Sequence, residues 1–177
     1  MNSFLELLET RQSCRGYTGQ PVEHEKLLAL VNAGRLAPSA CNSQPWSFVV
    51  VETPEVVKEV AACGQQMGIN EFMSDAGAFI IVVEEYAKLM PKLSCILNNQ
   101  YFAKGDIGGA AVQVCLAAAE QGLGTCSIGM FDRVRLRELL DIPNEKQIAA
   151  YIAVGYPSDE TIRDKKRKTI EEVTRFV

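Results

Sequence analysis

The stretch APSACNSQPWSFVVV, residues 37–51, passes from small polar side chains to a tryptophan and then to a continuous apolar run. Residues 46–52 are rich in β-branched and aromatic side chains, a composition that predicts a central strand. Two further runs, AFIIVVEEY at 78–86 and QIAAYIAVGYP at 147–157, predict buried strands, the second of which ends at Gly155.

Segments with helical periodicity alternate with these strands. They fall within residues 4–11, 23–37, 54–67, 105–124 and 132–143, with Ser3 as a candidate N-cap for the first. Segment 87–98 has no pattern that assigns it to an element. The alternation predicts a single α+β domain over residues 1–177, in three layers, with helices on both faces of the sheet.

The longest predicted helix carries a run of small residues. Gly108, Gly109, Ala110, Ala111 and 117–119 make one side of it nearly flat, which allows another backbone to approach closely.

Composition narrows the class of protein. The chain of 177 residues is 47% hydrophobic and 23% charged, which is typical of one globular domain. A formal net charge of -4 argues against a general nucleic-acid binder. No basic, apolar leader opens the chain and no apolar run approaches the roughly 20 residues that span a bilayer, so we expect a cytoplasmic protein without a membrane partner.

The cysteines and the single histidine form no recognisable catalytic or metal-binding motif. The six cysteines form no CxxC pair and no zinc-site spacing, and we expect them mostly as small buried residues, with thiol-redox chemistry as the alternative. His24 is the only histidine, which leaves almost nothing from which to build a Ser-His-Asp triad or a multi-histidine metal site. We expect it partly exposed at the start of a helix, and we expect no metal site.

Two short segments could bind a ligand, although neither GxGxxG nor GxxxxGK[ST] occurs. Arg11, Ser13 and Arg15 alternate, so in an extended segment they project together and suit a phosphate. The loop 38–42 combines a fixed backbone with short polar groups that can lie against a planar ligand. A solvated arginine turn and an ordinary turn before a strand are the structural alternatives.

Four stretches together resemble, in order and spacing, the nitroreductase family of FMN-dependent oxidoreductases. They are RQSCRGYTGQPV from Arg11, LAPSACNSQPWSFVVV from Leu36, DIGGAAVQVCLAAAEQGLGTCSIGMFD from Asp106, and KKRK followed by TIEEV. The resemblance implies an intertwined homodimer around a mixed or antiparallel sheet, with FMN bound at each of two sites in the subunit interface.

The resemblance also implies the residues that bind FMN. Within one subunit these are Arg11 and Ser13 at the phosphate and ribityl chain, with Gln12 between them, Arg15 near the pyrimidine edge, Asn70 at the ring, the backbone amides of Ile128 and Gly129 near N5, and Lys165 and Arg167 at the phosphate. Pro38, Ser39, Ala40 and Asn42 are expected to reach the flavin of the other subunit.

Two features depart from the family pattern. Met73 stands where larger members often carry a lysine, which leaves Arg15 as the main cation at the ring. Segment 87–104 matches nothing that the family pattern defines, and in the family this region helps to shape the substrate pocket.

The implied activity is hydride transfer from NAD(P)H through the flavin to an electron-poor small molecule, such as a nitroaromatic or quinone, in a ping-pong cycle. No catalytic side chain is expected, because the cofactor carries the chemistry. The alternatives are action on a halogenated or unsaturated ring or on free flavin, and a flavin-binding protein without turnover.

Overall fold

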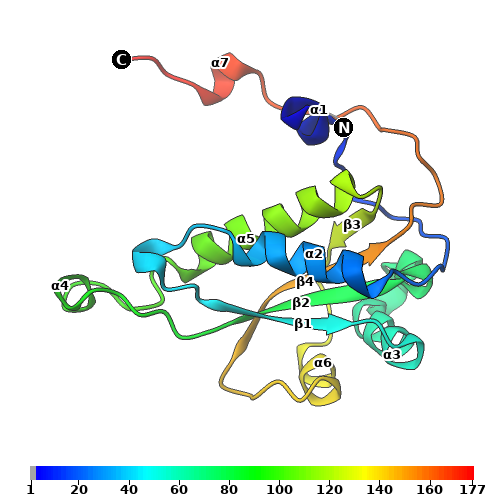
Figure 1. Ribbon diagram of the computed structural model, residues 1–177, viewed down its shortest axis with the longest axis horizontal. Helices are drawn as coiled ribbons and strands as arrows, with labels where there is room; N and C mark the ends of the chain where they lie inside the picture. Colours follow the sequence, from blue (N-terminus) through cyan, green and yellow to red (C-terminus); the bar gives the residue numbers. More distant parts are fainter. Residues whose placement is uncertain (1–2) are drawn as a thin grey trace.

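The computed structural model describes residues 3–177, in which the helices and strands alternate along the chain (Figure 1). The elements in chain order are α1 (Phe4–Thr10), α2 (His24–Arg35), η1 (Ala40–Asn42), β1 (Trp46–Val51), α3 (Pro54–Gly64), η2 (Gln66–Gly68), η3 (Glu71–Asp75), β2 (Ala78–Glu84), α4 (Pro91–Ser94), α5 (Ala103–Glu120), β3 (Gly124–Ser127), α6 (Arg133–Leu139), β4 (Gln147–Gly155) and α7 (Ile170–Val173).

The described strands form one antiparallel sheet in the order β1-β2-β4-β3. The three strands expected from their apolar runs are confirmed as β1, β2 and β4. The sequence prediction missed β3, because its four residues, GTCS, are too short and too small to show a strand pattern.

Strand β2 lies at the centre of the sheet, and its side chains supply two separate cores. Ala78, Ile80 and Val82 face the core beneath α2 and α5, whereas Phe79, Ile81 and Val83 face the core beneath α3 and α6. This alternation follows from the two-residue period of a strand. The sheet is therefore covered on both faces, and the expected three-layer α+β architecture is confirmed (Figure 1).

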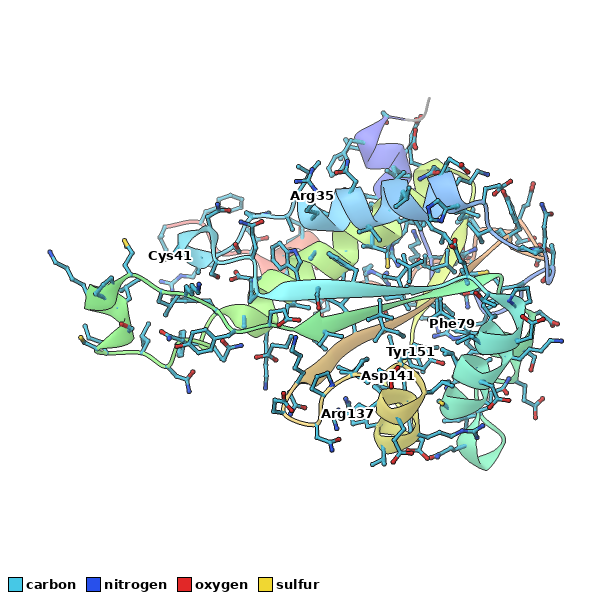
Figure 2. All side chains as sticks on the ribbon, turned by 60° about the horizontal axis from the view of Figure 1, so that its bottom comes forward. Arg35, Cys41, Phe79, Arg137, Asp141 and Tyr151 are labelled. Atoms are coloured by element: carbon cyan, nitrogen blue, oxygen red, sulfur yellow. The ribbon has the colours of Figure 1, made fainter. Side chains whose placement is uncertain are left out.

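Both cores show close packing. On the α2 side, a Cβ added to Gly34 would lie 2.8 Å from Phe48 and from Val114, so only glycine lets α2 approach this closely. On the α6 side, the rings of Phe79 and Tyr151 lie 5.4 Å apart beneath the sheet (Figure 2).

Several boundaries and burial states refine the predictions. A capping box at Ser3 starts α1, as expected. Helix α3 ends at Gly64 rather than near residue 67, and segment 87–98 contains the short α4 in an arm that projects from the body (Figure 1). The expectation of mostly buried cysteines is wrong, because only Cys63 and Cys126 are buried, whereas Cys14 and Cys115 are half-buried and Cys41 and Cys95 are exposed.

His24 opens α2 with an exposed side chain, as predicted. Within residues 3–177, no helix is long and apolar enough to cross a membrane.

Candidate functional site

Residues 11–15 form an extended segment that runs beside β3. Ser13 makes a parallel bridge with Thr125, and the Cys14 amide donates to the Thr125 carbonyl oxygen at 2.8 Å. Alternate side chains of such a segment point the same way, so Arg11, Ser13 and Arg15 share one side, as expected.

This side opens into a cavity of about 350 Å³, which we call the basic pocket. Its lining consists of Arg11, Gln12, Ser13, Arg15, Arg163, Asp164, Lys165, Lys166 and Arg167. The fold thus brings together two segments about 150 residues apart in the chain, and with them all the residues predicted for the phosphate and ribityl chain, as well as Arg15.

Gln12 and Arg163 hold the two segments together. The Gln12 side chain donates to the Thr161 carbonyl at 2.8 Å, and its oxygen accepts from the backbone and the side chain of Arg163, each at 3.1 Å. The Arg163 guanidinium also donates to the Ser13 carbonyl. The sequence prediction did not include Arg163, although it opens the basic run 163–168.

Like charges crowd the basic pocket. Desolvation, followed by the neighbouring charges of Arg11 and Arg167, holds the pKa of Lys165 below its usual value. Its ammonium donates to the last carbonyls of α1, at Leu8 and Glu9, where a cation is favoured. A bound anion with more than one negative charge would relieve this repulsion, which is the electrostatic character expected of a phosphate site.

A second cavity, of about 690 Å³, lies where β3 ends, and we call it the strand-end cavity. It is lined by Glu84, Lys104, Ile107, Gly108, Ala111, Ser127, Ile128, Gly129, Arg133 and Gln147–Tyr151. An irregular register between β2 and β4, opposite Val82 and Val83, shapes its wall.

Ile128 and Gly129, the two predicted backbone donors, both line this cavity but differ in availability. The Ile128 amide donates to the Tyr151 carbonyl at 2.7 Å, whereas within residues 3–177 no backbone carbonyl accepts from Gly129. Of the two backbone amides predicted to lie near the flavin N5, only that of Gly129 remains free of a backbone acceptor within the described residues.

Arg15 lines the basic pocket but not the strand-end cavity. Because residues 11–15 run parallel to β3 with Ser13 opposite Thr125, the segment leads from the pocket towards Ser127. Burial raises the pKa of the Cys126 thiol, and the positive charge of Arg15 opposes that rise.

The loop that contains Pro38, Ser39, Ala40 and Asn42 lies at the other end of the molecule (Figures 1 and 2). The Ala40 amide donates to the carboxylate of Asp106 at the start of α5, whereas Arg11 and Gln12 share a cavity with Ala119 at its end. At a rise of 1.5 Å per residue, these points on α5 are about 20 Å apart. Within one chain, the fold does not bring this loop to the basic pocket.

Two other predicted positions lie outside the cavities just described. Asn70 adopts a left-handed backbone with φ 57°, and its side-chain amide donates to the Gly64 carbonyl at 3.0 Å. Met73 is fully buried in the core beneath α3, where it contacts Gly64.

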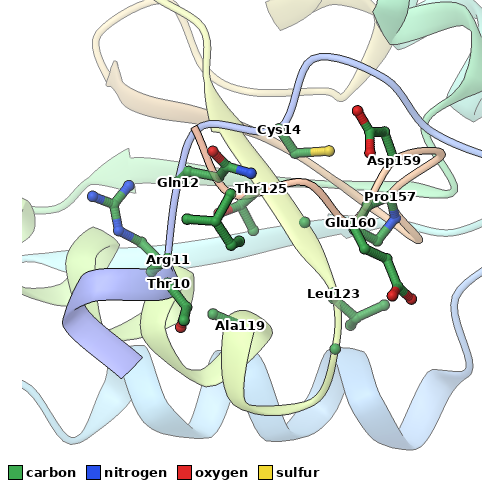
Figure 3. Close-up of a pocket in the computed structure, with 13 residues that line it drawn as sticks. Thr10, Arg11, Gln12, Cys14, Ala119, Leu123, Thr125, Pro157, Asp159 and Glu160 are labelled. Carbon is green, nitrogen blue, oxygen red and sulfur yellow. The ribbon is translucent and has the colours of Figure 1, made fainter. Parts of the chain in front are cut away.

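A third cavity, of about 390 Å³, shares Arg11 and Gln12 with the basic pocket (Figure 3). Asp159 and Glu160 line it, whereas the Arg11 guanidinium points away from them. Its carboxylates make it a poor site for a phosphate.

The fold is that of a three-layer α+β protein with a basic pocket beside the short strand β3. Residues 8–67 and 56–156 match the nitroreductase family, and the chain belongs to that family.

Relatives and solved structures agree with this assignment. A protein of Archaeoglobus fulgidus with the provisional name NADH dehydrogenase/NAD(P)H nitroreductase is 32% identical over 90% of this chain and 88% of its own. Iodotyrosine deiodinase 1 of Rattus norvegicus is 26% identical over 96% of this chain and 68% of its own. The structure of an FMN-dependent nitroreductase from Clostridium difficile superposes with a TM-score of 0.78 at 26% identity, covering 98% of both chains.

Proposed function

We propose that this protein is a single-domain, FMN-dependent oxidoreductase of the cytoplasm that moves hydride from NAD(P)H to an electron-poor small molecule, such as a nitroaromatic or quinone, in a ping-pong cycle. The observation that carries the proposal is the basic pocket, in which Arg11, Lys165 and Arg167 converge without a counter-anion of comparable charge. Six free thiols are compatible with a reducing compartment.

The residues of the basic pocket fit the phosphate of FMN. Arg11, Lys165 and Arg167 would donate to its oxygens, and the Ser13 hydroxyl would add a neutral hydrogen bond. Gln12 would act indirectly, because its side chain is committed to the tail that carries Lys165.

The neighbouring strand-end cavity would hold the ring. When bound, FMN supplies a site that takes up hydride from NAD(P)H and passes it to the acceptor. Arg15 would place a permanent positive charge at the pyrimidine edge, and the amide of Gly129 would orient the ring near N5. Asn70, which the resemblance assigns to the ring, lines neither the strand-end cavity nor the basic pocket, and its NH2 group donates to the Gly64 carbonyl.

A homodimer would complete this site with Pro38, Ser39, Ala40 and Asn42 of the second copy. Their distance from the basic pocket of their own chain supports this arrangement. So does α5, on which a Cβ added to Gly105, Gly108 or Gly109 would meet nothing within 4 Å, leaving room for another backbone. Exposed apolar residues of the C-terminal tail, including Phe176, would wrap around the partner.

The first test is a visible spectrum of the purified protein without air, before and after NADH and then NADPH. We expect a flavin spectrum that either nucleotide bleaches and that a quinone restores. Bound flavin that neither nucleotide bleaches would favour a non-catalytic flavin-binding protein, and protein that takes up no FMN would contradict the proposal.

Reductive removal of a halogen from an aromatic ring is a second candidate, favoured by the similarity to iodotyrosine deiodinase 1 over 96% of the chain. Steady-state comparison of nitro, quinone and iodinated acceptors would separate the two. A larger kcat/KM for the iodinated ring would establish the second candidate.

A further inference from the structure

The strand-end cavity carries an excess of positive charge. Lys104 enters its lining from the first turn of α5 and Arg133 from the start of α6, whereas Glu84 is its only carboxylate. That carboxylate is already engaged, because the Gln100 amide donates to it at 2.7 Å. Within the described residues, neither Lys104 nor Arg133 forms a salt bridge.

Arg133 is held in place by neutral groups. Its guanidinium donates to the Ile148 carbonyl at 3.1 Å and lies 4.5 Å from the centre of the Phe131 ring. These contacts orient the planar group yet leave several of its five N–H donors for a ligand. The adjacent Asp132 does not neutralise it, since its carboxylate caps α6 and accepts from Gln66.

Arg135, two residues further along α6, shows the contrast. Its guanidinium pairs with Glu59 at 2.7 Å and takes no part in the cavity lining. Helix α6 therefore carries Arg135, whose charge is balanced by Glu59, and Arg133, which lines the strand-end cavity without a salt-bridge partner among the described residues.

We propose that Arg133, assisted by Lys104, binds an anionic oxygen group on the acceptor, so that the enzyme prefers aromatic acceptors with a carboxylate. This inference rests on the proposed function. A guanidinium matches a carboxylate with two parallel hydrogen bonds. The phosphates of NAD(P)H are the other anions that enter the site, but a ribose separates them from the nicotinamide ring, whereas a ring carboxylate stays within the cavity beside Gly129.

The test compares 4-nitrobenzoate with its neutral methyl ester as oxidants of the reduced, FMN-loaded enzyme in stopped-flow experiments. For Arg133→Gln we expect the second-order rate constant with the carboxylate to fall about 10-fold, as suits one charge-assisted contact at an accessible site. The ester should change less than about twofold, and Lys104→Gln should lower the carboxylate rate by about threefold.

Arg135→Gln is the matched control, and we expect it to leave both acceptors unchanged. The carboxylate preference of the unmodified enzyme should also weaken as salt is raised, because the contact is accessible to solvent. Flavin content is measured in every variant, so that a loss of cofactor is not mistaken for a loss of acceptor binding.

Two outcomes would overturn the inference. Equal losses for carboxylate and ester would mean that Arg133 only supports the cavity wall. Slower flavin reduction by NAD(P)H, with acceptor rates intact, would assign the cations to the dinucleotide phosphates. If neither nucleotide reduces the flavin of the unmodified protein, the proposed function fails first and the inference fails with it.

Discussion

The basic pocket and the loop 38–42 differ in how much of a binding site one chain can assemble. The pocket is complete within the chain, because Gln12 joins residues 11–15 to the tail through three hydrogen bonds. The loop lies at the far end of α5 and bonds only to its surroundings, with the Ser39 hydroxyl accepting from the Gln44 amide at 2.9 Å. The basic residues thus come together within one copy, whereas the small polar groups of the loop stay apart from them.

The largest expected effect is on the basic pocket. Replacing both Lys165 and Arg167 by alanine removes two charge-assisted contacts and should weaken FMN binding by at least about 100-fold. Titration of the apoprotein with FMN, followed by flavin fluorescence, measures this change. Lys58→Ala, at an exposed position on α3, serves as the control, and an equal loss in that variant would contradict a specific role for the tail.

Mixing two defective variants tests directly whether the loop 38–42 and the basic pocket of one chain belong to different sites. One variant lacks Lys165 and Arg167, and the other carries Ser39→Ala and Asn42→Ala. If the loop acts across the dimer, mixed dimers regain one intact site of the two, and FMN binding at low cofactor concentration should recover in proportion. Absence of recovery after subunit exchange has been verified would place the loop and the pocket of one chain in the same site.

The third prediction distinguishes the basic pocket from the loop 38–42 by how strongly the effect of a substitution on FMN binding depends on salt. Ser39→Ala alone should weaken FMN binding by about fivefold, as suits a neutral hydrogen bond, and the factor should stay constant as salt is raised. The corresponding factor for Arg11→Ala should shrink with salt, because that contact is between charges. Dissociation constants measured at low and high ionic strength would test this, and equal salt dependence would remove the distinction.

The smallest expected effect is on stability and concerns His24, which belongs neither to the basic pocket nor to the loop 38–42. Hydrogen bonding and the charge of Glu52 raise its pKa, so the pair stabilises the fold at low pH, and this contribution is lost as pH rises through the raised value. Glu52→Gln should flatten the pH dependence of Tm above about pH 6.5 without changing FMN affinity. A changed affinity would show that the site extends to α2.

Much of the fold could be predicted because its signals are local. Strands β1, β2 and β4 are runs of branched and aromatic residues, and α1 begins at a capping box. Strand β3 could not be predicted, since its identity depends on pairing with β4 rather than on its own composition. The four-residue α4 is equally short, and it lies in a segment without periodicity.

The candidate site likewise has parts that the sequence predicts and parts that it does not. The alternating arginines and the basic tail are visible in the sequence, and the structure brings them into one pocket. The contact of Arg163 with Ser13 could not be foreseen, because it joins segments about 150 residues apart. Nor could the difference between Ile128 and Gly129, because it follows from the hydrogen bond of the Ile128 amide to the Tyr151 carbonyl.

The sequence by itself determined which residues carry charge, which are small, and where the periodicity of a strand or a helix begins, because these depend on neighbours a few residues away. Only the tertiary structure decided that the tail reaches residues 11–15 and that the loop 38–42 lies about 20 Å away along α5. It also decided that Arg133 faces a cavity while Arg135 pairs with Glu59. The physical reason is that contacts between distant segments depend on the packing of the whole sheet, which no local pattern records.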